Sequence, residues 1–196
     1  AMRALIAVLL GTICFSGIPN SAPGRWIPIG SPGGCDVRAL CVLGSRVLAS
    51  IPGGDDHSLF ASADSGRNWR PSDSGLSEYT WIECIVGCGA GLYAGTDNGY
   101  VYISEDAGAH WRPVAGGRTH RSGIEGLAVT EKALYAGTVF GGAFVLRSGE
   151  ADWDPVSSGL PPEVQITALV TDGDRVFAGT SGAGVFALKA GEAVWT

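Results

Sequence analysis

The sequence predicts an all-β protein, a small β-propeller of four-stranded antiparallel blades with about 42 residues in each. Five of the six tryptophans, Trp26, Trp69, Trp111, Trp153 and Trp195, follow one another at intervals of 43, 42, 42 and 42 residues. An apolar segment ending in Gly-Thr recurs at the same interval, at residues 92–96, 134–138 and 176–180. No stretch of any length shows the periodicity of an amphipathic helix. Four short strands fit each repeat.

The order of strands within a repeat follows from these two markers. Apolar stretches at residues 82–86, 124–129 and 166–170 precede the Gly-Thr segments and predict the first strand, while the Gly-Thr segments predict the second. Residues 37–42 and 47–51 are a degenerate copy of this pair. A third strand follows each Gly-Thr loop. The tryptophan opens a fourth, in which a nearby proline fits an outermost edge position.

Residues 2–34 continue the repeat in a shortened form. Residues 2–5 echo residues 37–40, residues 13–17 echo residues 92–95, and Trp26-Ile27-Pro28 repeats the Trp-x-Pro signature. These matches predict five blades with a shortened first blade. In the alternative, the apolar run after Arg3 is an N-terminal signal segment, and four blades remain.

The whole chain, residues 1–196, is therefore predicted to be one β-propeller domain with repeats at 2–34, 35–77, 78–121, 122–161 and 162–196. The last repeat stops where its outer strand should begin, which predicts closure by the N-terminal segment or self-association through this incomplete blade. A cytoplasmic location is favoured. Residues 2–22, if they are a signal peptide, predict a secreted or periplasmic one.

The segment between the third and fourth strands carries a family resemblance. Ser62, Asp64, Gly66 and Trp69 form the pattern Ser-x-Asp-x-Gly-x-x-Trp, which returns at Ser104, Asp106, Gly108 and Trp111. This pattern resembles the Asp-box, or BNR repeat, of sialidases, sortilin-type receptors, xyloglucan-cleaving glycosidases and photosystem II assembly factors. The resemblance implies a propeller fold but no single function, because these proteins include enzymes, receptors and scaffolds. A structural role in the turn is expected for the eight residues.

Composition excludes several classes of function. The formal charge is −6, and only two lysines are present, which argues against nucleic acid as a partner. The apolar run near the N-terminus is too short to span a membrane. The five cysteines form no pair of CxxC units, so a zinc site is not expected, and Cys84 and Cys88 are taken as free thiols in preference to a disulfide. No metal or cofactor is predicted, since Asp64 and Asp106 lack the further oxygen ligands that calcium requires.

Candidate ligand-binding residues lie on the propeller face that carries the loops between blades and between second and third strands. Trp81 is the one tryptophan outside the repeat register, and Trp81, Tyr79 and Glu78 have the composition of a stacking platform for a sugar or a peptide. Arg118, His120 and Arg121 form the one basic cluster, and Phe140 lies in another loop of this face.

These features predict a non-catalytic binding or scaffold propeller that presents one loop face to a protein partner. A small carbohydrate-binding, lectin-like propeller is the second interpretation. The third is a sialidase-like glycoside hydrolase, in which Glu83 and Glu125, at equivalent positions of neighbouring inner strands, supply the carboxylates. The family's early Arg-Ile-Pro motif is absent and no catalytic residue is assigned, so the sequence favours a protein that is not an enzyme.

Overall fold

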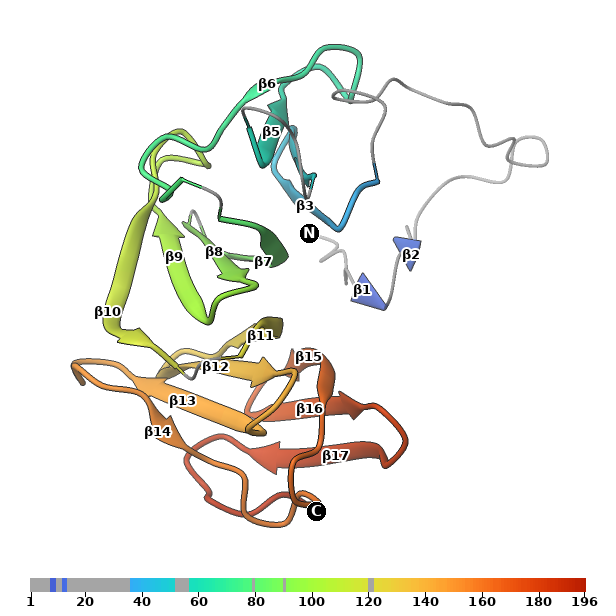
Figure 1. Cartoon of the computed structure of the whole chain (residues 1–196), viewed down its shortest axis with the longest axis vertical. Helices are drawn as coiled ribbons and strands as arrows, with labels where there is room; N and C mark the ends of the chain where they lie inside the picture. The colour runs from blue at the N-terminus through green and yellow to red at the C-terminus, as the bar shows by residue number, and fades with distance from the viewer. Residues whose placement is uncertain are drawn as a thin grey trace, which may run out of the picture.

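Antiparallel sheets make up the regular structure of the described chain, which confirms the all-β propeller prediction (Figure 1). The computed structural model describes residues 8–9, 12–13, 36–51, 57–78, 80–89, 91–119 and 122–196. Four meandering sheets follow one another along the chain, and a short hairpin, β1 (Val8–Leu9) with β2 (Thr12–Ile13), precedes them. No helix within these ranges is long and apolar enough to cross a membrane.

Each of the first three sheets has four strands, and the fourth sheet has three. Sheet 1 consists of β3 (Ala39–Leu43), β4 (Arg46–Ser50), β5 (Leu59–Ser62) and β6 (Arg70–Pro71). Sheet 2 consists of β7 (Ile82–Cys88), β8 (Gly91–Thr96), β9 (Tyr100–Ser104) and β10 (Arg112–Arg118). Sheet 3 consists of β11 (Ile124–Val129), β12 (Ala133–Thr138), β13 (Ala143–Arg147) and β14 (Asp154–Pro155). Sheet 4 consists of β15 (Ile166–Asp172), β16 (Arg175–Thr180) and β17 (Gly184–Lys189).

The sequence repeat appears in the structure as the same pairing between the first and second strands of sheets 2, 3 and 4. Ile82 pairs with Thr96, Ile124 with Thr138 and Ile166 with Thr180, and the register shifts once just after each of these pairs. The sheets are arranged in an arc, and their first strands β3, β7, β11 and β15 face its centre (Figure 1). Successive inner strands contact each other, as expected of propeller blades around a channel.

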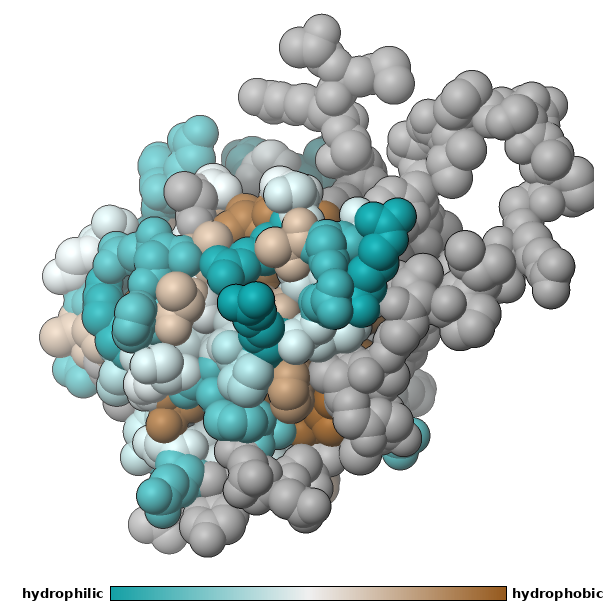
Figure 2. Space-filling view, turned by 90° about the horizontal axis from the view of Figure 1, so that it is seen from above, coloured by the Kyte–Doolittle hydropathy of each residue, from teal (hydrophilic) through white to brown (hydrophobic). Residues whose placement is uncertain are grey.

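The core lies between sheets, because each sheet buries side chains against its neighbours. Leu48 and Leu59 of sheet 1 pack with Ile82 and Leu92 of sheet 2 in one cluster. A second cluster joins Tyr135 and Val145 of sheet 3 to sheet 4 residues such as Ile166, Val176 and Leu188. The visible outer surface is mainly hydrophilic, with smaller hydrophobic areas between (Figure 2).

Two tryptophans fasten neighbouring sheets together. Trp111 Nε1 donates a hydrogen bond of 2.8 Å to the Ser72 carbonyl, and the Trp111 backbone N–H donates to the Ser74 carbonyl at 2.8 Å. Trp195 repeats the arrangement: its Nε1 donates to the Val156 carbonyl at 2.5 Å and its backbone N–H to the Ser158 carbonyl at 2.8 Å. We call each of these a tryptophan clasp. One clasp joins sheets 1 and 2, and the other joins sheets 3 and 4.

The junction between sheets 2 and 3 has a different form. Strand β10 continues to Arg118, which pairs with Tyr100 after a shift in register, whereas β6 and β14 end after two residues. Arg118 was expected in an inter-blade loop, but the structure places it in this strand, with its guanidinium carbon 5.0 Å from the centre of the Tyr100 ring. Trp153 Nε1 is buried and has no hydrogen-bond partner within the described residues.

The fourth sheet lacks a complete outer strand. The Ala187 backbone N–H donates to the Thr196 carbonyl at 2.8 Å, and the Thr196 N–H donates back at 2.9 Å. These two bonds place Thr196 where the outer strand of the other sheets begins. Of the N-terminal repeat, the structure describes only the β1–β2 hairpin; Trp26 and the rest of residues 14–35 lie outside the described residues. The number of blades therefore stays a prediction.

Candidate binding face at the channel mouth

The four inner strands line a channel of about 890 Å³. Its wall is largely apolar along β7, β11 and β15, but one end carries polar side chains. Each inner strand has one polar residue at the same position of the repeat, near its beginning. These residues are Arg38, which directly precedes β3, and Glu83, Glu125 and Thr167. Polar groups thus collect at the channel end that faces the inter-blade loops.

The charged groups at this end are paired across sheet boundaries. Arg38 Nε lies 2.5 Å from Glu83 Oε2, and the Glu83 side chain is largely buried. Gln165 Nε2 donates a hydrogen bond of 2.9 Å to Glu125 Oε2. The two carboxylates considered for glycoside hydrolysis are therefore each bonded to a side chain of another sheet. Glu83 is neutralised by a cation, whereas the partner of Glu125 is a neutral amide.

A smaller pocket of about 270 Å³ opens beside these carboxylates. It is lined by Arg38, Glu83, Asp97, Ser122, Gly123, Glu125, Val139 and Phe140. The lining comes from sheets 1, 2 and 3, so the pocket depends on the arrangement of the blades. Asp97 and Glu125 have no cationic partner among the described side chains, and the pocket carries a net negative charge.

Phe140 is presented to solvent from a rigid backbone. Its side chain is 65% exposed, although a phenyl ring of this size is usually buried. The Phe140 backbone N–H donates to Ser122 Oγ at 2.8 Å, and its carbonyl accepts from Thr138 Oγ1 at 2.9 Å. The neighbouring Val139 N–H donates to the Gly123 carbonyl at 3.0 Å. The loop is held firmly while the ring remains free for contact.

Trp81 lies on the same loop face, next to Asp97. The Asp97 backbone N–H donates to the Trp81 carbonyl at 3.0 Å, and the Trp81 N–H donates to Asp97 Oδ1 at 3.3 Å. The Trp81 side chain is 45% exposed, and Glu78 is exposed as well. The structure therefore brings Phe140 and Trp81 to the predicted face. Tyr79, His120 and Arg121 lie outside the described residues.

Sequence reasoning did not select Arg38, Ser122 or Gln165 for this site. Arg38 lies in the repeat match of residues 37–40, at the position that Glu83 occupies in the next repeat. An Arg beside a Glu on neighbouring inner strands predicts an ion pair. Ser122 and Gln165 carry no such signal, because their roles depend on loop conformations.

The three cysteines of the described chain are free thiols, and two of them are largely buried. Cys41, Cys84 and Cys88 form no disulfide, in agreement with the preferred interpretation of Cys84 and Cys88, although Cys88 is exposed. Burial raises the pKa of the Cys41 thiol to about 11 and that of Cys84 to about 12. The Cys41 and Cys84 thiols therefore stay protonated at neutral pH and serve as small apolar groups packed between neighbouring sheets.

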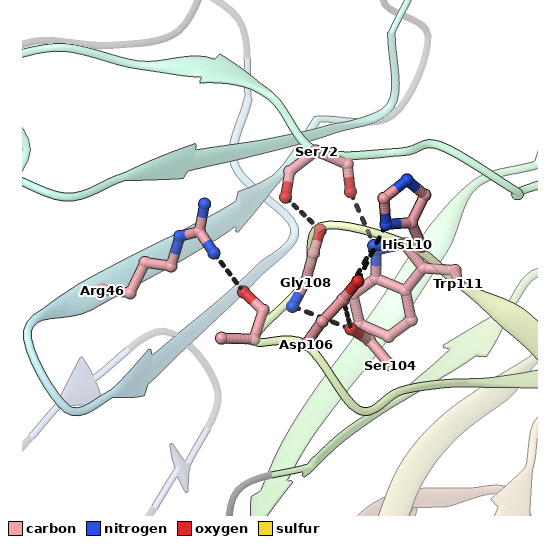
Figure 3. Close-up of polar contacts among 8 residues, drawn as sticks. Arg46, Ser72, Ser104, Asp106, Gly108, His110 and Trp111 are labelled. Carbon is pink, nitrogen blue, oxygen red and sulfur yellow. Dashed lines mark hydrogen bonds and ion pairs between the residues drawn. The ribbon is translucent and has the colours of Figure 1, made fainter.

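The two Ser-x-Asp-x-Gly turns form the same network on the opposite face. Ser62 Oγ donates to Asp64 Oδ1 at 2.8 Å and accepts from the Gly66 N–H at 2.8 Å, and Asp64 Oδ1 also accepts from the Asn68 N–H at 2.8 Å. Ser104, Asp106, Gly108 and His110 repeat these contacts (Figure 3).

The second turn also touches sheet 1. Arg46 Nη1 donates to the Ala107 carbonyl at 2.9 Å, and Ser72 Oγ donates to the Gly108 carbonyl at 2.5 Å (Figure 3). A side chain at Gly108 would approach Leu48 to 2.7 Å. This turn therefore has a place in the packing between two sheets, next to the Trp111 clasp.

Hydrogen bonds keep both turn carboxylates ionised. The Asn68 side chain, then the Asn68 backbone and then Ser62 lower the pKa of Asp64 to about 2. The His110 backbone and ring likewise lower the pKa of Asp106. Because the folded-state pKa is depressed, each carboxylate stabilises the fold above its ordinary pKa near 3.8, and this contribution is lost as the pH falls toward the folded-state value.

An NMR titration of the Asp64 carboxyl carbon is expected to show a midpoint near pH 2. Asn68→Ala removes the largest cause of the shift and is expected to move the midpoint upward. A wild-type midpoint at the ordinary value of 3.8 contradicts this account of the turn. The unchanged titration of Asp106 in the same variant serves as the control, because Asn68 does not contact that carboxyl.

The described residues were also compared for clusters of metal-ligating side chains. Among them, no group of three or more His, Cys, Asp or Glu side chains is arranged to hold a metal ion. The channel mouth carries the exposed aromatic rings of Trp81 and Phe140 together with the carboxylates of Glu83, Asp97 and Glu125.

Comparison with known proteins supports the fold. No protein-family model and no curated protein matches the sequence. Among solved structures, the chain resembles the computationally designed Ika4 protein with a TM-score of 0.63 and 14% identity, covering 85% of this chain and all of that one. The WD40 repeats of RRP9 align with a TM-score of 0.66 and 19% identity, over 85% of this chain and 52% of that one.

A third similar structure is YCF48 bound to D1 peptide, with a TM-score of 0.57 and 14% identity, over 82% of this chain and 52% of that chain. The chain thus spans about half the length of the natural propellers YCF48 and RRP9. Its meandering sheets around a channel, together with these structural neighbours, define the protein as a β-propeller.

Proposed function

We propose that this propeller is a non-catalytic binding module that presents its loop face to a protein partner, and that it belongs to the Asp-box type. The observation that carries the function is the pocket formed by three sheets beside the exposed ring of Phe140. A phenyl ring held on a fixed backbone loses little conformational freedom on binding, which favours its use as an anchor.

The charge of the pocket specifies the partner's chemistry. Asp97 and Glu125 face it without a cationic partner among the described residues, while Arg38 is already paired with Glu83. A Lys or Arg side chain of an extended segment fits this surface, because it can meet the carboxylates and stack on Phe140. In YCF48, a related fold has been solved with a peptide bound. That likeness supports a peptide-binding role here.

The test is a selection of displayed peptides on the wild-type protein, followed by affinity measurements on the selected sequences. Lys or Arg enrichment is expected, and Glu125→Gln is expected to weaken binding at least tenfold, or about 1.4 kcal/mol. Phe140→Ala is expected to do the same. The matched control is Glu131→Gln, because Glu131 is an exposed carboxylate in the β11–β12 turn at the far end of the same sheet.

Equal affinity of wild type, Glu125→Gln and Phe140→Ala contradicts the proposed pocket. A glycan-binding function is the second candidate, favoured by the exposed indole of Trp81. Binding to a glycan array that disappears in Trp81→Ala, with no peptide selected, supports that candidate in place of the first.

A further inference from the structure

Hydrogen bonds between neighbouring sheets are unevenly distributed around the channel. Between sheets 1 and 2, the Trp111 clasp is supplemented by Arg46 Nη1, which donates to the Ala107 carbonyl at 2.9 Å (Figure 3). Ser50 Oγ donates a further, buried hydrogen bond of 2.8 Å to the Ile82 carbonyl. Sheets 3 and 4 are joined by the second clasp. Separation at either of these two boundaries therefore breaks several buried hydrogen bonds.

The boundary between sheets 2 and 3 has fewer connections. Among the described residues, no tryptophan clasp and no ion pair crosses it, and the buried Trp153 indole N–H has no partner. The Cys84 thiol donates a long hydrogen bond of 3.4 Å to the Ile124 carbonyl. The apolar cluster at this boundary has five buried residues, compared with nine between sheets 1 and 2 and twelve between sheets 3 and 4. Separation here therefore exposes the smallest apolar cluster.

The side-chain bonds at the channel mouth follow the same division. Arg38 of sheet 1 bonds to Glu83 of sheet 2, and Gln165, directly before sheet 4, bonds to Glu125 of sheet 3. Asp97 follows a strand of sheet 2, so Asp97 and Glu125 belong to different sides of the boundary, although both line the small pocket. Two carboxylates that share a pocket without a cation repel each other. The empty pocket therefore adds no attraction between sheets 2 and 3.

Sheets 2 and 3 do approach each other closely, at two glycines. A Cβ atom at Gly95 would lie 2.7 Å from Ile124 Cγ2, and a Cβ atom at Gly123 would lie 3.1 Å from the Asp97 carbonyl oxygen. These approaches are van der Waals contacts, so the two sheets can separate here without breaking a strong hydrogen bond.

We propose that sheets 1 and 2 and sheets 3 and 4 act as two rigid halves that open and close at the boundary between sheets 2 and 3, and that a cationic side chain bound between Asp97 and Glu125 holds this boundary closed. An Arg or Lys side chain bonds to one carboxylate from each half and removes the repulsion between them. A ligand that binds one of two conformations more tightly shifts the population toward it. The coupling to a ligand rests on the proposed function, whereas the opening does not.

Thiol labelling of the full-length chain under native conditions tests the opening. Val101→Cys places a thiol in the cluster between sheets 2 and 3, and Val145→Cys places one in the cluster between sheets 3 and 4. Val101 is 0% exposed and Val145 is 2% exposed, and the same chemical change is made at both positions. Peptide mass spectrometry reads each site separately from the native cysteines.

The thiol introduced at position 101 is expected to react with a maleimide at least about tenfold faster than the thiol introduced at position 145, and faster than global unfolding measured in urea allows. Leu127→Cys, in the same cluster as Val101, is the second probe of this boundary if Val101→Cys does not fold.

Nα-acetylarginine amide is the probe for the coupling. Increasing concentrations of this compound are expected to slow labelling at position 101 at least about fivefold and to leave labelling at position 145 unchanged. Glu125→Gln is expected to abolish the effect, whereas Glu131→Gln, at the far end of the same sheet, is expected to retain it.

The other outcomes overturn the proposal in distinguishable ways. Equal labelling rates at positions 101 and 145 show that the two halves do not separate. Fast labelling at position 101 that Nα-acetylarginine amide does not slow, in a protein that binds the selected peptides, shows that the ligand does not close the boundary. Binding is measured separately from the NMR chemical shifts of Phe140 and Glu125. If neither the amide nor a selected peptide binds, the proposed function fails together with the coupling.

Discussion

Gly75→Ala is expected to lower the free energy of unfolding by at least about 3 kcal/mol. Gly75 has a φ of +88°, and a Cβ atom at this position would overlap the carbonyl oxygen of Trp111. Relief of that overlap requires the Trp111 backbone to move away, which breaks its hydrogen bonds to Ser74 and Ser72. The cost therefore combines a strained backbone with the loss of a clasp between sheets.

Gly149→Ala is the matched control for this prediction. Gly149 has a φ of +85°, and its Cβ would meet no atom within 4 Å. Alanine there carries only the left-handed backbone cost, about 1–2 kcal/mol. Urea denaturation of the two variants measures the difference. Equal losses of stability would show that the contact between Gly75 and Trp111 contributes nothing beyond backbone strain.

Gly137→Ala is expected to cost about 2–3 kcal/mol, near the upper end for an overpacked core. Gly137 lies in β12, where its Cβ would overlap Cγ2 of Ile166 and lie 2.9 Å from Ile166 Cβ. Ile166 is fully buried on the first strand of the next sheet, so it has no free space into which to move. The glycine of the Gly-Thr motif is therefore required by the close approach of neighbouring sheets.

Gly91→Ala provides the control in a strand, since its Cβ would lie 3.6 Å from the nearest atoms. Thermal and urea denaturation are expected to show Gly91→Ala close to wild type. The double variant Gly137→Ala, Ile166→Ala removes the overlapping methyl group, and the two changes are expected to be non-additive, with a smaller loss than their sum. Strict additivity contradicts direct contact as the cause.

The sequence predicted the strands and their order within a repeat, but it did not predict their register or how the sheets join. Trp111 and Trp153 occupy the same repeat position, yet only Trp111 is part of a clasp. The difference lies in the segment that follows the tryptophan of the preceding sheet. After Trp69 and after Trp153, the turns Ser74-Gly75 and Ser158-Gly159 approach the next tryptophan, whereas after Trp111 residues 112–118 continue as β10. The two Ser-Gly pairs are 84 residues apart, which is two repeats. A comparison of each repeat with the next one, 42 residues away, therefore does not detect them.

The candidate site was predicted in part. Trp81 and Phe140 were selected because they are aromatic residues in loops, and both are exposed on the predicted face. The pairing of Arg38 with Glu83 and of Gln165 with Glu125 required the arrangement of neighbouring inner strands. Arg118 was expected in a basic loop. It lies over the Tyr100 ring because β10 extends to residue 118, and no local pattern in residues 112–118 predicts a strand of this length.

The alternation of clasps has a consequence for how such a chain can lengthen or shorten. The smallest segment that contains a complete clasp is two consecutive sheets, about 84 residues, because a tryptophan on one sheet requires the Ser-Gly turn of the sheet before it. Duplication or deletion of a whole pair leaves every clasp intact, whereas insertion of one sheet inside a pair separates donor from acceptor. The unit whose duplication or deletion preserves every clasp is therefore the pair of blades.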